Sequence, residues 1–519
     1  MPVQDEKEPE VWRFEVVDEA ATLAIAAAQA AWLEPGDFVA LSGDLGAGKT
    51  MFARGLLRAL LEEPSLEAPS PTFTLMQVYD APHGPVVHAD FYRLRGPLEL
   101  ENLGWDEAIE GAVAIVEWPE RIPEALPPDR LEVTLRYDPS RGPEFRVLEM
   151  RGLGRVARRL GRALSVGTLL EGAGWGEAKR EFLQGDASVR LYERLTKADG
   201  ATAILMISPP RPEGPIIRFG KPYAAIARLA TDIRAFLAVA EGLRGLGFSA
   251  PRILAASVEH GLALIEDLGA ETVVEDGAPN PVRYAEAVAL IADLHGRDLP
   301  DALPVGEELY PLPTYDVEAM LIEVELIIDW YAASVARTAV PSGARMQFLR
   351  VWRDILGPIL AEPTTWTLRD FHSPNLHWLP DRPGVARVGL IDFQDAVLGP
   401  PAYDLASLLQ DARVDVPDDL EMRLMAFYVR RRSLADPAFD AERFAASYAA
   451  MAAQRATKIL GLFARLDKRD GKPQYLKHLP RIERYLAKDL AHPLLAPLAL
   501  WYQAHLPQAL GPGPASPEP

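Results

Sequence analysis

Residues 37–61 restrict the fold of this chain more than any other segment. The apolar run 37–41 predicts a buried strand, a helical pattern occupies 52–61, and between them stands the loop Gly43-Asp44-Leu45-Gly46-Ala47-Gly48-Lys49-Thr50. Backbone N–H groups of such a loop point at phosphate oxygens, Lys49 can neutralise the outer phosphates and Thr50 can ligate Mg²⁺. The order of strand, glycine loop and helix therefore predicts an α/β P-loop NTPase domain that binds ATP at this loop.

Two further strands of this region end beside a carboxylate. Residues 87–94 read Val-His-Ala-Asp-Phe-Tyr-Arg-Leu and contain Asp90, and the apolar run 112–116 is followed by Glu117. A Rossmann-like sheet binds its ligand at the carboxyl ends of its strands. Asp90 and Glu117 are therefore candidate site residues, whereas we interpret His88 as structural.

The ordered motifs GDLGAGKT, SPTFTL, HADFYRL and VEWPER resemble the TsaE family over residues 10–150. Members of that family are small ATPases required for threonylcarbamoyladenosine formation on tRNA. The resemblance implies that the glycine loop and Thr22 surround ATP, that Thr50 and Glu117 hold Mg²⁺, and that Asp90, with Thr72, is catalytic or switch-like. It also implies the tRNA-threonylcarbamoylating proteins as partners. A nucleotide-switched binding module is the alternative to an ATPase.

Residues 367–409 restrict the second half of the chain in the same way. Asp370 is followed five positions later by Asn375 in a polar turn, and Asp392 ends the apolar run 388–391. Phosphoryl transfer needs a carboxylate that accepts the proton of the attacking hydroxyl, which suits Asp370, and oxygen ligands for Mg²⁺, which suit Asn375 and Asp392. The pattern D-x-x-x-x-N followed by a strand-borne D-F resembles the catalytic segment of protein-kinase-like enzymes, in particular the aminoglycoside phosphotransferase family. Leu368 stands where that family usually has His, and we expect Asp404 to anchor the catalytic loop.

The expected nucleotide-covering hairpin of this kinase-like half, residues 185–195, contains Ser188 and Arg190. The strand at 202–208 is the one that usually carries a lysine for the α- and β-phosphates, but here it reads TAILMIS. Arg190 is the first candidate to replace that lysine, with Lys179 and Lys221 behind it. A helix is expected at 223–243. The strand 263–269 is expected to leave the small lobe, where the backbone of Glu266 and Leu268 would meet adenine.

The phrases GDASVRLYERL, LRDFHSPNLHW, IDFQDAVLGPPAYDLASLLQD and QRATKILGLFARLDKRDGKPQYL are similar to AmgK-type anomeric kinases over residues 172–508. Those kinases phosphorylate N-acetylmuramate and N-acetylglucosamine at C1 in peptidoglycan recycling. The resemblance, and not the spacing of the motif, implies this sugar acceptor. An anomeric hydroxyl is more acidic than the other sugar hydroxyls, so Asp370 would accept its proton more easily.

Two helical regions supply candidates for the sugar pocket. Glu325 and Asp329 lie four residues apart on one helix face, beside Trp330, and either hydrogen-bond sugar hydroxyls or form a solvated acidic stripe. A lactyl carboxylate would need a cation, for which Arg455 and Lys458 are the candidates, with Arg465 on the same helix. The alternative is that these cations pair with surface acids.

Composition limits the partners that this chain can have. The net charge of -20 disfavours direct binding of nucleic acid through the field of the whole protein. The chain contains no cysteine, which fits a reducing cytoplasm, and it has no apolar run long enough to cross a bilayer. We therefore expect a cytoplasmic protein that binds neither nucleic acid directly nor membranes.

The length of 519 residues predicts two or three domains, and the motifs divide the chain into two. The second is predicted to be α+β, protein-kinase-like and two-lobed. The expected divisions are a P-loop ATPase at 1–152, a linker with a basic patch at 153–171, a sugar kinase at 172–510 with its lobes meeting near 270, and a disordered tail at 511–519.

The leading hypothesis is a bifunctional fusion of a TsaE-like ATPase and an ATP-dependent sugar 1-kinase, both using Mg²⁺. Two alternatives concern the kinase half. It could be a degenerate binding domain, as the absent lysine and Leu368 suggest, or it could phosphorylate an aminoglycoside or a choline-like molecule.

Overall fold

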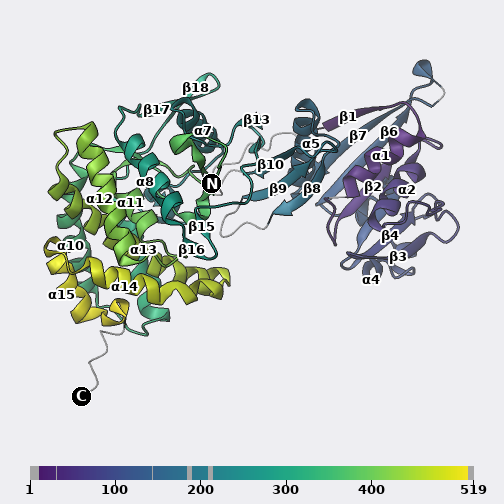
Figure 1. The fold of residues 1–519 in the computed structure, drawn as a ribbon. Helices are drawn as coiled ribbons and strands as arrows, with labels where there is room; N and C mark the ends of the chain where they lie inside the picture. The colour runs from purple at the N-terminus through teal and green to yellow at the C-terminus, as the bar shows by residue number, and fades with distance from the viewer. Residues whose placement is uncertain (1–10, 31, 143, 184–189, 209–213, 512–519) are drawn as a thin grey trace. The chain divides into compact units, whose positions relative to one another are not determined.

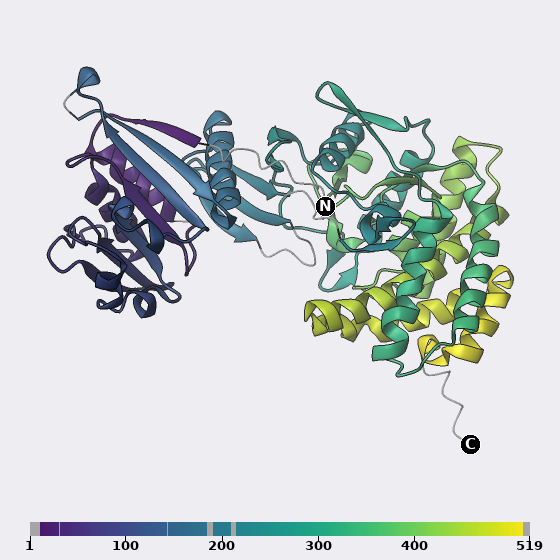
Figure 2. The same ribbon diagram turned by 180° about the vertical axis from the view of Figure 1, so that it is seen from behind.

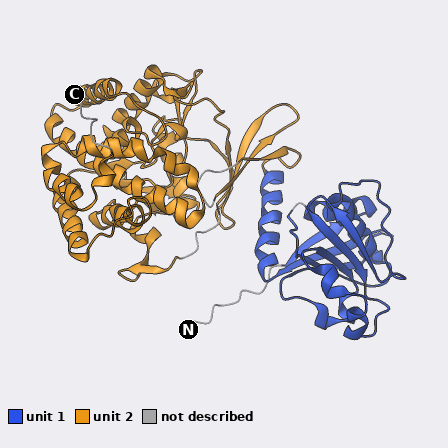
Figure 3. Ribbon diagram, turned by 90° about the horizontal axis from the view of Figure 1, so that it is seen from below, with its two compact units in different colours: residues 1–172 blue, residues 173–519 orange. Residues whose placement is uncertain are grey.

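The computed structural model describes residues 11–30, 32–142, 144–183, 190–208 and 214–511 (Figure 1). The chain divides into two compact units, residues 1–172 and 173–519, coloured separately in Figure 3. The predicted hairpin residue Ser188 and residues 512–519 of the predicted tail lie outside the described residues.

A seven-stranded sheet in the order β1-β7-β6-β2-β5-β4-β3 forms the centre of the first unit. Strand β2 runs parallel to β5 and β6, and β4 runs parallel to β5, whereas β1, β7 and β3 pair antiparallel to their neighbours. The strands are β1 Val11–Val16, β2 Phe38–Ser42, β3 Met76–Ala81, β4 Gly84–Asp90, β5 Val113–Glu117, β6 Arg130–Tyr137 and β7 Arg146–Leu153.

Hydrophobic cores cover both faces of this sheet because successive strand residues point to opposite sides. Val39 and Leu41 of β2 belong to a core that includes side chains of α1 (Glu19–Ala30) and α2 (Lys49–Leu60). Phe38 and Ala40 belong to a second core with Trp105 of α4 (Trp105–Ile109), which follows the short helix α3 (Pro97–Glu101).

The segment 153–171, predicted as a linker, is mostly helical. Helix α5 (Arg155–Gly172) belongs to the first unit, and Val156 and Leu160 join its core. Its basic side chains are partly neutralised, because Arg155 pairs with Asp129 and Arg159 pairs with Glu34 and Asp37.

The second unit begins with a five-stranded antiparallel sheet in the order β13-β14-β10-β9-β8. Its strands are β8 Lys179–Leu183, β9 Leu191–Thr196, β10 Thr202–Ile207, β13 Ile253–Ser257 and β14 Leu262–Glu266, and helix α7 (Arg234–Gly245) lies between β10 and β13 in the sequence. The expectation of one helix at 223–243 is wrong. That segment contains the short helix α6 (Tyr223–Ile226) and most of the separate helix α7, because the backbone turns at Arg228, where φ is 56°.

The rest of the second unit is largely helical (Figures 1 and 2). Short strand pairs, β20 (Leu376–Trp378) with β21 (Val388–Leu390) and β19 (Thr365–Thr367) with β22 (Val397–Gly399), frame the catalytic segment. Smaller hairpins are β11 Ile216–Arg218 with β12 Lys221–Pro222, β15 Val274–Glu275 with β16 Ala278–Pro279, and β17 Ala302–Val305 with β18 Glu308–Pro311.

The helices of this lobe include the 30-residue α13, against which α9, α11 and α14 pack. In chain order, the helices are α8 Pro281–His295, α9 Val317–Leu326, which continues into a π-helical turn at Ile327–Ala332, α10 Ser342–Leu360, α11 Ala402–Leu409, α12 Asp418–Ala435, α13 Ala441–Asp470, α14 Leu479–Asp489 and α15 Ala496–His505. None of the helices in the described ranges has the length and apolar character that crossing a membrane requires.

Candidate active sites

The glycine loop of the first unit borders a pocket of about 300 Å³. The carboxyl ends of the parallel strands converge there, since Asp90 of β4 is the register partner of Glu117 of β5, which in turn is opposite Leu41 of β2. Many of the predicted site residues line this pocket, namely Thr22, Leu45, Gly46, Gly48, Lys49, Thr50, Asp90 and Glu117.

Lys49 is folded back onto its own loop. Its Nζ donates hydrogen bonds to the carbonyl oxygens of Gly43 at 2.7 Å and Asp44 at 2.9 Å, and it lies 3.6 Å from the centre of the Trp118 ring. Burial lowers the pKa of Lys49, although the nearby carboxylates, Glu117 first among them, oppose this shift. A bound phosphate would offer the ammonium group a stronger acceptor than these carbonyls.

Thr50 and Glu117 form an oxygen-rich pair at the start of α2. Thr50 Oγ1 donates to Glu117 Oε2 at 2.9 Å, while His88 Nε2 lies 3.0 Å from Glu117 Oε1. His88 is completely buried. The histidine therefore orients the carboxylate from behind, and the hydroxyl and carboxylate oxygens are donors that suit Mg²⁺.

Asp90 holds the preceding loop in place. Its Oδ2 accepts hydrogen bonds from Ser70 and from Thr72 Oγ1, the latter at 2.9 Å, and its Oδ1 accepts one from the Tyr92 N–H. The residue thus connects the loop at the pocket to the end of β4.

Arg146 is a pocket residue that sequence reasoning missed. It lies on β7, and its Nε donates to the Ala47 carbonyl of the glycine loop at 3.0 Å, although 99 positions separate the two residues. No local motif marks it, because its place at the loop depends on the pairing of β7 with β6.

In the second unit, the β20–β21 hairpin brings Asn375 and Asp392 to one end. Leu376 is opposite Leu390, and the Ile391 N–H donates to the Asn375 carbonyl at 3.1 Å. Asn375 and Ile391, the residue before Asp392, are therefore neighbours at this end of the hairpin. Asn375 Nδ2 donates to the Asp370 carbonyl at 2.9 Å. Burial, and then the charge of Asp392, raise the pKa of Asp370, which places both carboxylates in one electrostatic environment.

Two buried carboxylates hold the catalytic loop. Asp404 of α11 accepts hydrogen bonds from the backbone N–H groups of Leu368 at 2.6 Å and Arg369 at 2.8 Å. Asp411 accepts from the Ser373 N–H at 2.8 Å and from the Ser373 hydroxyl. Asp411 was missed, although two acids seven residues apart in an apolar stretch were a signal that could have indicated it.

The candidates to replace the small-lobe lysine lie in different places. Arg190 Nη1 is 3.2 Å from Asp392 Oδ1, which also accepts a hydrogen bond from Gln394. Lys179 pairs with Glu181 on an exposed strand, and Lys221 is exposed. Among the three, the structure brings Arg190 to Asp392.

Glu266 and Leu268, the residues expected to meet adenine, lie at and after the end of β14, and their side chains contact other parts of the protein. Glu266 accepts hydrogen bonds from Arg382 Nη2 at 2.7 Å and from the Arg252 N–H at 3.1 Å, and Leu268 is mostly buried. Any contact of these residues with a nucleotide base therefore falls to their backbone groups.

The acidic candidates for the sugar pocket are held by arginines. Glu325 is buried, and its carboxylate pairs with Arg218 at 2.7 Å and with Arg345 at 3.0 Å. Asp329 pairs with Arg345 as well, and the neighbouring Trp330 is half-buried against the core. Glu325 is thus a buried carboxylate paired with two partly exposed arginines and not part of a solvated stripe.

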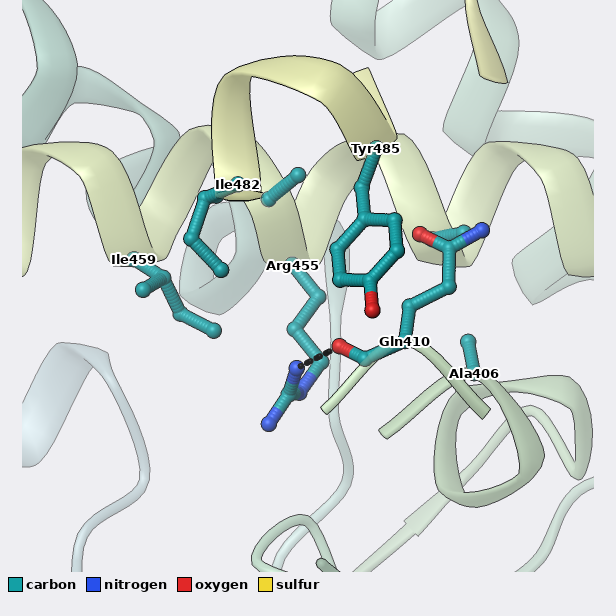
Figure 4. Close-up of a pocket in the computed structure, with 8 residues that line it drawn as sticks. Ala406, Gln410, Arg455, Ile459, Ile482 and Tyr485 are labelled. Atoms are coloured by element: carbon teal, nitrogen blue, oxygen red, sulfur yellow. Dashed lines mark hydrogen bonds between the residues drawn. The ribbon is translucent and has the colours of Figure 1, made fainter. Parts of the chain in front are cut away.

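The cationic candidates are also partnered. Lys458 Nζ lies 2.9 Å from Glu323 Oε1 and 3.4 Å from the Tyr403 hydroxyl. Arg455 is mostly buried, and its Nη1 donates to the Gln410 carbonyl at 3.2 Å beside an internal cavity of about 10 Å³ (Figure 4). Among the described residues, the partners of both cations are buried groups of the same lobe and not surface acids.

Comparison with known proteins relates each unit to a different family. The family described as "Threonylcarbamoyl adenosine biosynthesis protein TsaE" matches residues 16–143, and the phosphotransferase enzyme family, APH, matches residues 179–446. The N-acetylmuramate/N-acetylglucosamine kinase of Caulobacter vibrioides is 37% identical over 358 residues, which are 67% of this chain and 97% of that protein.

The tRNA threonylcarbamoyladenosine biosynthesis protein TsaE of Rickettsia bellii is 42% identical over 118 residues, which are 23% of this chain and 81% of that protein. A solved structure of a Plasmodium vivax ethanolamine kinase is 10% identical, covers 66% of this chain and 91% of that chain, and has a TM-score of 0.45.

Proposed function

We infer the function of this chain from the two families to which it belongs. It is a member of the TsaE family through residues 16–143 and of the APH phosphotransferase family through residues 179–446. It is a fusion of a TsaE homologue with a homologue of N-acetylmuramate/N-acetylglucosamine kinases. Its second unit transfers the γ-phosphoryl group of ATP to the anomeric hydroxyl of N-acetylmuramate or N-acetylglucosamine. Its first unit hydrolyses ATP in the threonylcarbamoyladenosine modification of tRNA, in the cytoplasm.

The observation that carries the kinase proposal is the grouping of Asp370, Asn375 and Asp392 around one hairpin end. Asp370 accepts the proton of the C1 hydroxyl as the phosphoryl group is transferred. The raised pKa of Asp370 makes it a stronger proton acceptor than an ordinary aspartate, as long as the carboxylate is ionised at the working pH. Asp404 and Asp411 keep the loop in position for this transfer.

Magnesium fits the oxygen donors of both sites. Asn375 with Asp392 would hold it in the second unit, and Thr50 with Glu117 in the first. The described residues contain no cluster of three or more His, Cys, Asp or Glu side chains that could hold a metal. This suits a cation that takes one or two protein carboxylates and completes its shell with phosphates and water. When bound, Mg²⁺ neutralises charge on the phosphate oxygens.

The nucleotide contacts follow from the placement of the remaining residues. Arg190 is the cation proposed to contact the phosphates, because it lies beside Asp392. The backbone at Glu266 and Leu268 receives the adenine ring. In the first unit, Lys49 exchanges its two carbonyl partners for phosphate oxygens, and the glycine loop surrounds the phosphate chain.

A panel of acceptors, monitored by phosphorus NMR for products of the wild type and of Asp370→Asn, tests the kinase proposal. Wild type should give a hexosamine 1-phosphate, and the variant should form it about 10² to 10⁴ times more slowly, the usual contribution of a positioned base. Phosphorylation of an aminoglycoside or a choline-like molecule, with no hexosamine product, would contradict the proposal.

The proposal for the first unit is tested by capture of the tRNA-threonylcarbamoylating proteins with ATP or with ADP. The contacts of Asp90 to Ser70 and Thr72 at the pocket give the loop a route by which the γ-phosphate could change it. Binding that depends on ATP, together with turnover of ATP, supports the proposed role. Equal capture with ATP and with ADP would contradict a nucleotide switch. Capture without any nucleotide, together with no ATP turnover, would contradict the ATPase role.

A further inference from the structure

One face of helix α13 runs from the catalytic loop towards its C-terminal end. Lys458 and Arg465 share this face, because seven residues make about two helical turns, a rise of about 10 Å. Lys458 is close enough to Asp370 for each charge to act on the pKa of the other. Tyr223 of α6 lies near both residues: its ring is 5.1 Å from the Arg465 guanidinium, and, although burial raises its pKa, the charges of Arg465 and Lys458 both act to lower it.

Most cations of this region already hold an anionic partner. Two acidic side chains use them in pairs, Glu325 with Arg218 and Arg345, and Glu323 with Arg369 and Lys458. These four cations are therefore unsuited to bind the charge of a ligand without breaking an internal ion pair.

Arg465 differs from them. Its guanidinium lies 5.1 Å from the centre of the Tyr223 ring, and its Nε is buried without a hydrogen-bond partner within the described parts of the chain. The charge of Arg465 contributes to the lowered pKa of Asp470, but that carboxylate is held by Arg469 at 2.7 Å. A guanidinium has five N–H donors in a planar fork that matches a carboxylate, and stacking on an aromatic ring fixes its plane.

We propose that Arg465 binds the carboxylate of the acceptor sugar, which makes N-acetylmuramate the preferred acceptor over N-acetylglucosamine. The inference rests on the proposed sugar kinase function. The lactyl group of muramate is an ether at C3, two ring positions from the carbon that carries the C1 hydroxyl. The proposal places C1 at Asp370 and the carboxylate on the side of the sugar that faces Arg465, about two helical turns beyond Lys458 on α13. The contact with the Tyr223 ring restrains the guanidinium group and so reduces the ordering cost of binding the carboxylate.

The test measures kcat/KM of wild type and Arg465→Gln with three acceptors: N-acetylmuramate, its neutral carboxamide, and N-acetylglucosamine. The variant should lose about 10- to 100-fold in kcat/KM with N-acetylmuramate, mainly through KM, as expected for the loss of a charge-assisted hydrogen bond. Its kcat/KM with the carboxamide and with N-acetylglucosamine should change less than about 3-fold. Arg465→Lys should restore part of the loss.

Arg469→Gln is the matched control. It removes the same charge one turn further along α13 from an exposed side chain that pairs with Asp470, and all three acceptors should keep their wild-type values. An equal loss of all acceptors in Arg465→Gln overturns the inference, because it indicates a structural role, and so does no loss of any. Wild-type activity on N-acetylglucosamine reports on the proposed function separately, since that sugar has no carboxylate.

Discussion

Glu323 organises the cations beneath the catalytic loop. It is almost fully buried, pairs with Arg369 and Lys458, and also accepts a hydrogen bond from Gln454 Nε2 at 3.2 Å. Burial acts to raise the pKa of Glu323, but the charges of Lys458 and then Arg369 outweigh it, so the pKa is lowered. The acid therefore stays ionised, and the two cations beside Asp370 stay fixed.

A buried histidine makes the stability of the second unit depend on pH. Burial lowers the pKa of His295, although Asp404, whose Oδ2 lies 3.7 Å from His295 Nε2, opposes the shift. The other ring nitrogen of His295, Nδ1, lies 2.9 Å from the Tyr428 hydroxyl. Below about pH 6.5 the unfolded chain binds a proton at this residue and the folded chain does not. The free energy of unfolding should therefore fall as the pH drops below that value.

Thermal unfolding of wild type and His295→Gln at pH 7.5 and pH 5.5 checks this dependence. The variant should unfold at a lower temperature at pH 7.5, because it loses a buried hydrogen bond with a contribution of about 1 kcal/mol. Its further fall on going to pH 5.5 should be smaller than that of wild type. If both proteins lose the same amount, His295 is not the titrating group.

At the scale of elements, the crossing of α13 with the end of α9 depends on one glycine. A Cβ at Gly461 would lie 2.2 Å from the carbonyl carbon of Leu326 and 2.4 Å from the nitrogen of Ile327. These are backbone atoms at the start of the π-helical turn, so they cannot move aside as a flexible side chain can.

Gly461→Ala should therefore destabilise the second unit by about 1 to 3 kcal/mol, the usual cost of overpacking. Its melting temperature measures the effect. The control is Gly343→Ala in α10, where an added Cβ has no atom within 4 Å and the stability should stay the same or rise slightly. A Gly461→Ala protein as stable as wild type would contradict the prediction, because α13 and the end of α9 would then accommodate the added methyl group without loss of free energy of unfolding.

The segment between β10 and α7 shows why helical periodicity alone misplaced an element. Residues 223–243 have helix-forming composition, but positive φ values at Phe219 and Arg228 break the chain into a hairpin, a short helix and a separate longer one. Arg228 is fixed there by an ion pair with Asp316, a residue from another part of the lobe. Such tertiary partners decide where a helix ends when its sequence could continue.

At the scale of the molecule, each unit has its own hydrophobic core. The cores of the first unit contain buried residues up to Leu160, and the main core of the second begins at Met206. The two nucleotide sites should therefore work independently. Lys49→Ala should reduce sugar-independent ATP turnover by about 10²-fold or more and leave sugar phosphorylation unchanged, and Asp370→Asn should do the reverse.

Parallel assays of sugar 1-phosphate formation and of sugar-independent ATP hydrolysis on both variants measure this independence. Each variant serves as the control for the other, because each removes one charged side chain from one site. A proportional loss of both activities in either variant would show that the sites are coupled.

The sequence by itself determined the parts whose chemistry is contiguous. The P-loop NTPase and kinase-like fold classes, the two families and the kind of reaction were predicted correctly, because a glycine loop after a strand, or D-x-x-x-x-N before a strand-borne Asp, holds its functional groups within one short segment. The individual roles of the site residues stay predictions.

Only the tertiary structure decided which charges remain available. Arg146 reaches the glycine loop from 99 positions away, Arg190 reaches Asp392 from 202 positions away, and Arg218 takes Glu325 from 107 positions away. No local pattern encodes such pairs, because long-range packing brings the partners together. That packing pairs the predicted sugar-pocket residues Glu325 and Lys458 with other charges. It leaves Arg465, on the same helix as Lys458, with a buried Nε that has no hydrogen-bond partner in the described segments.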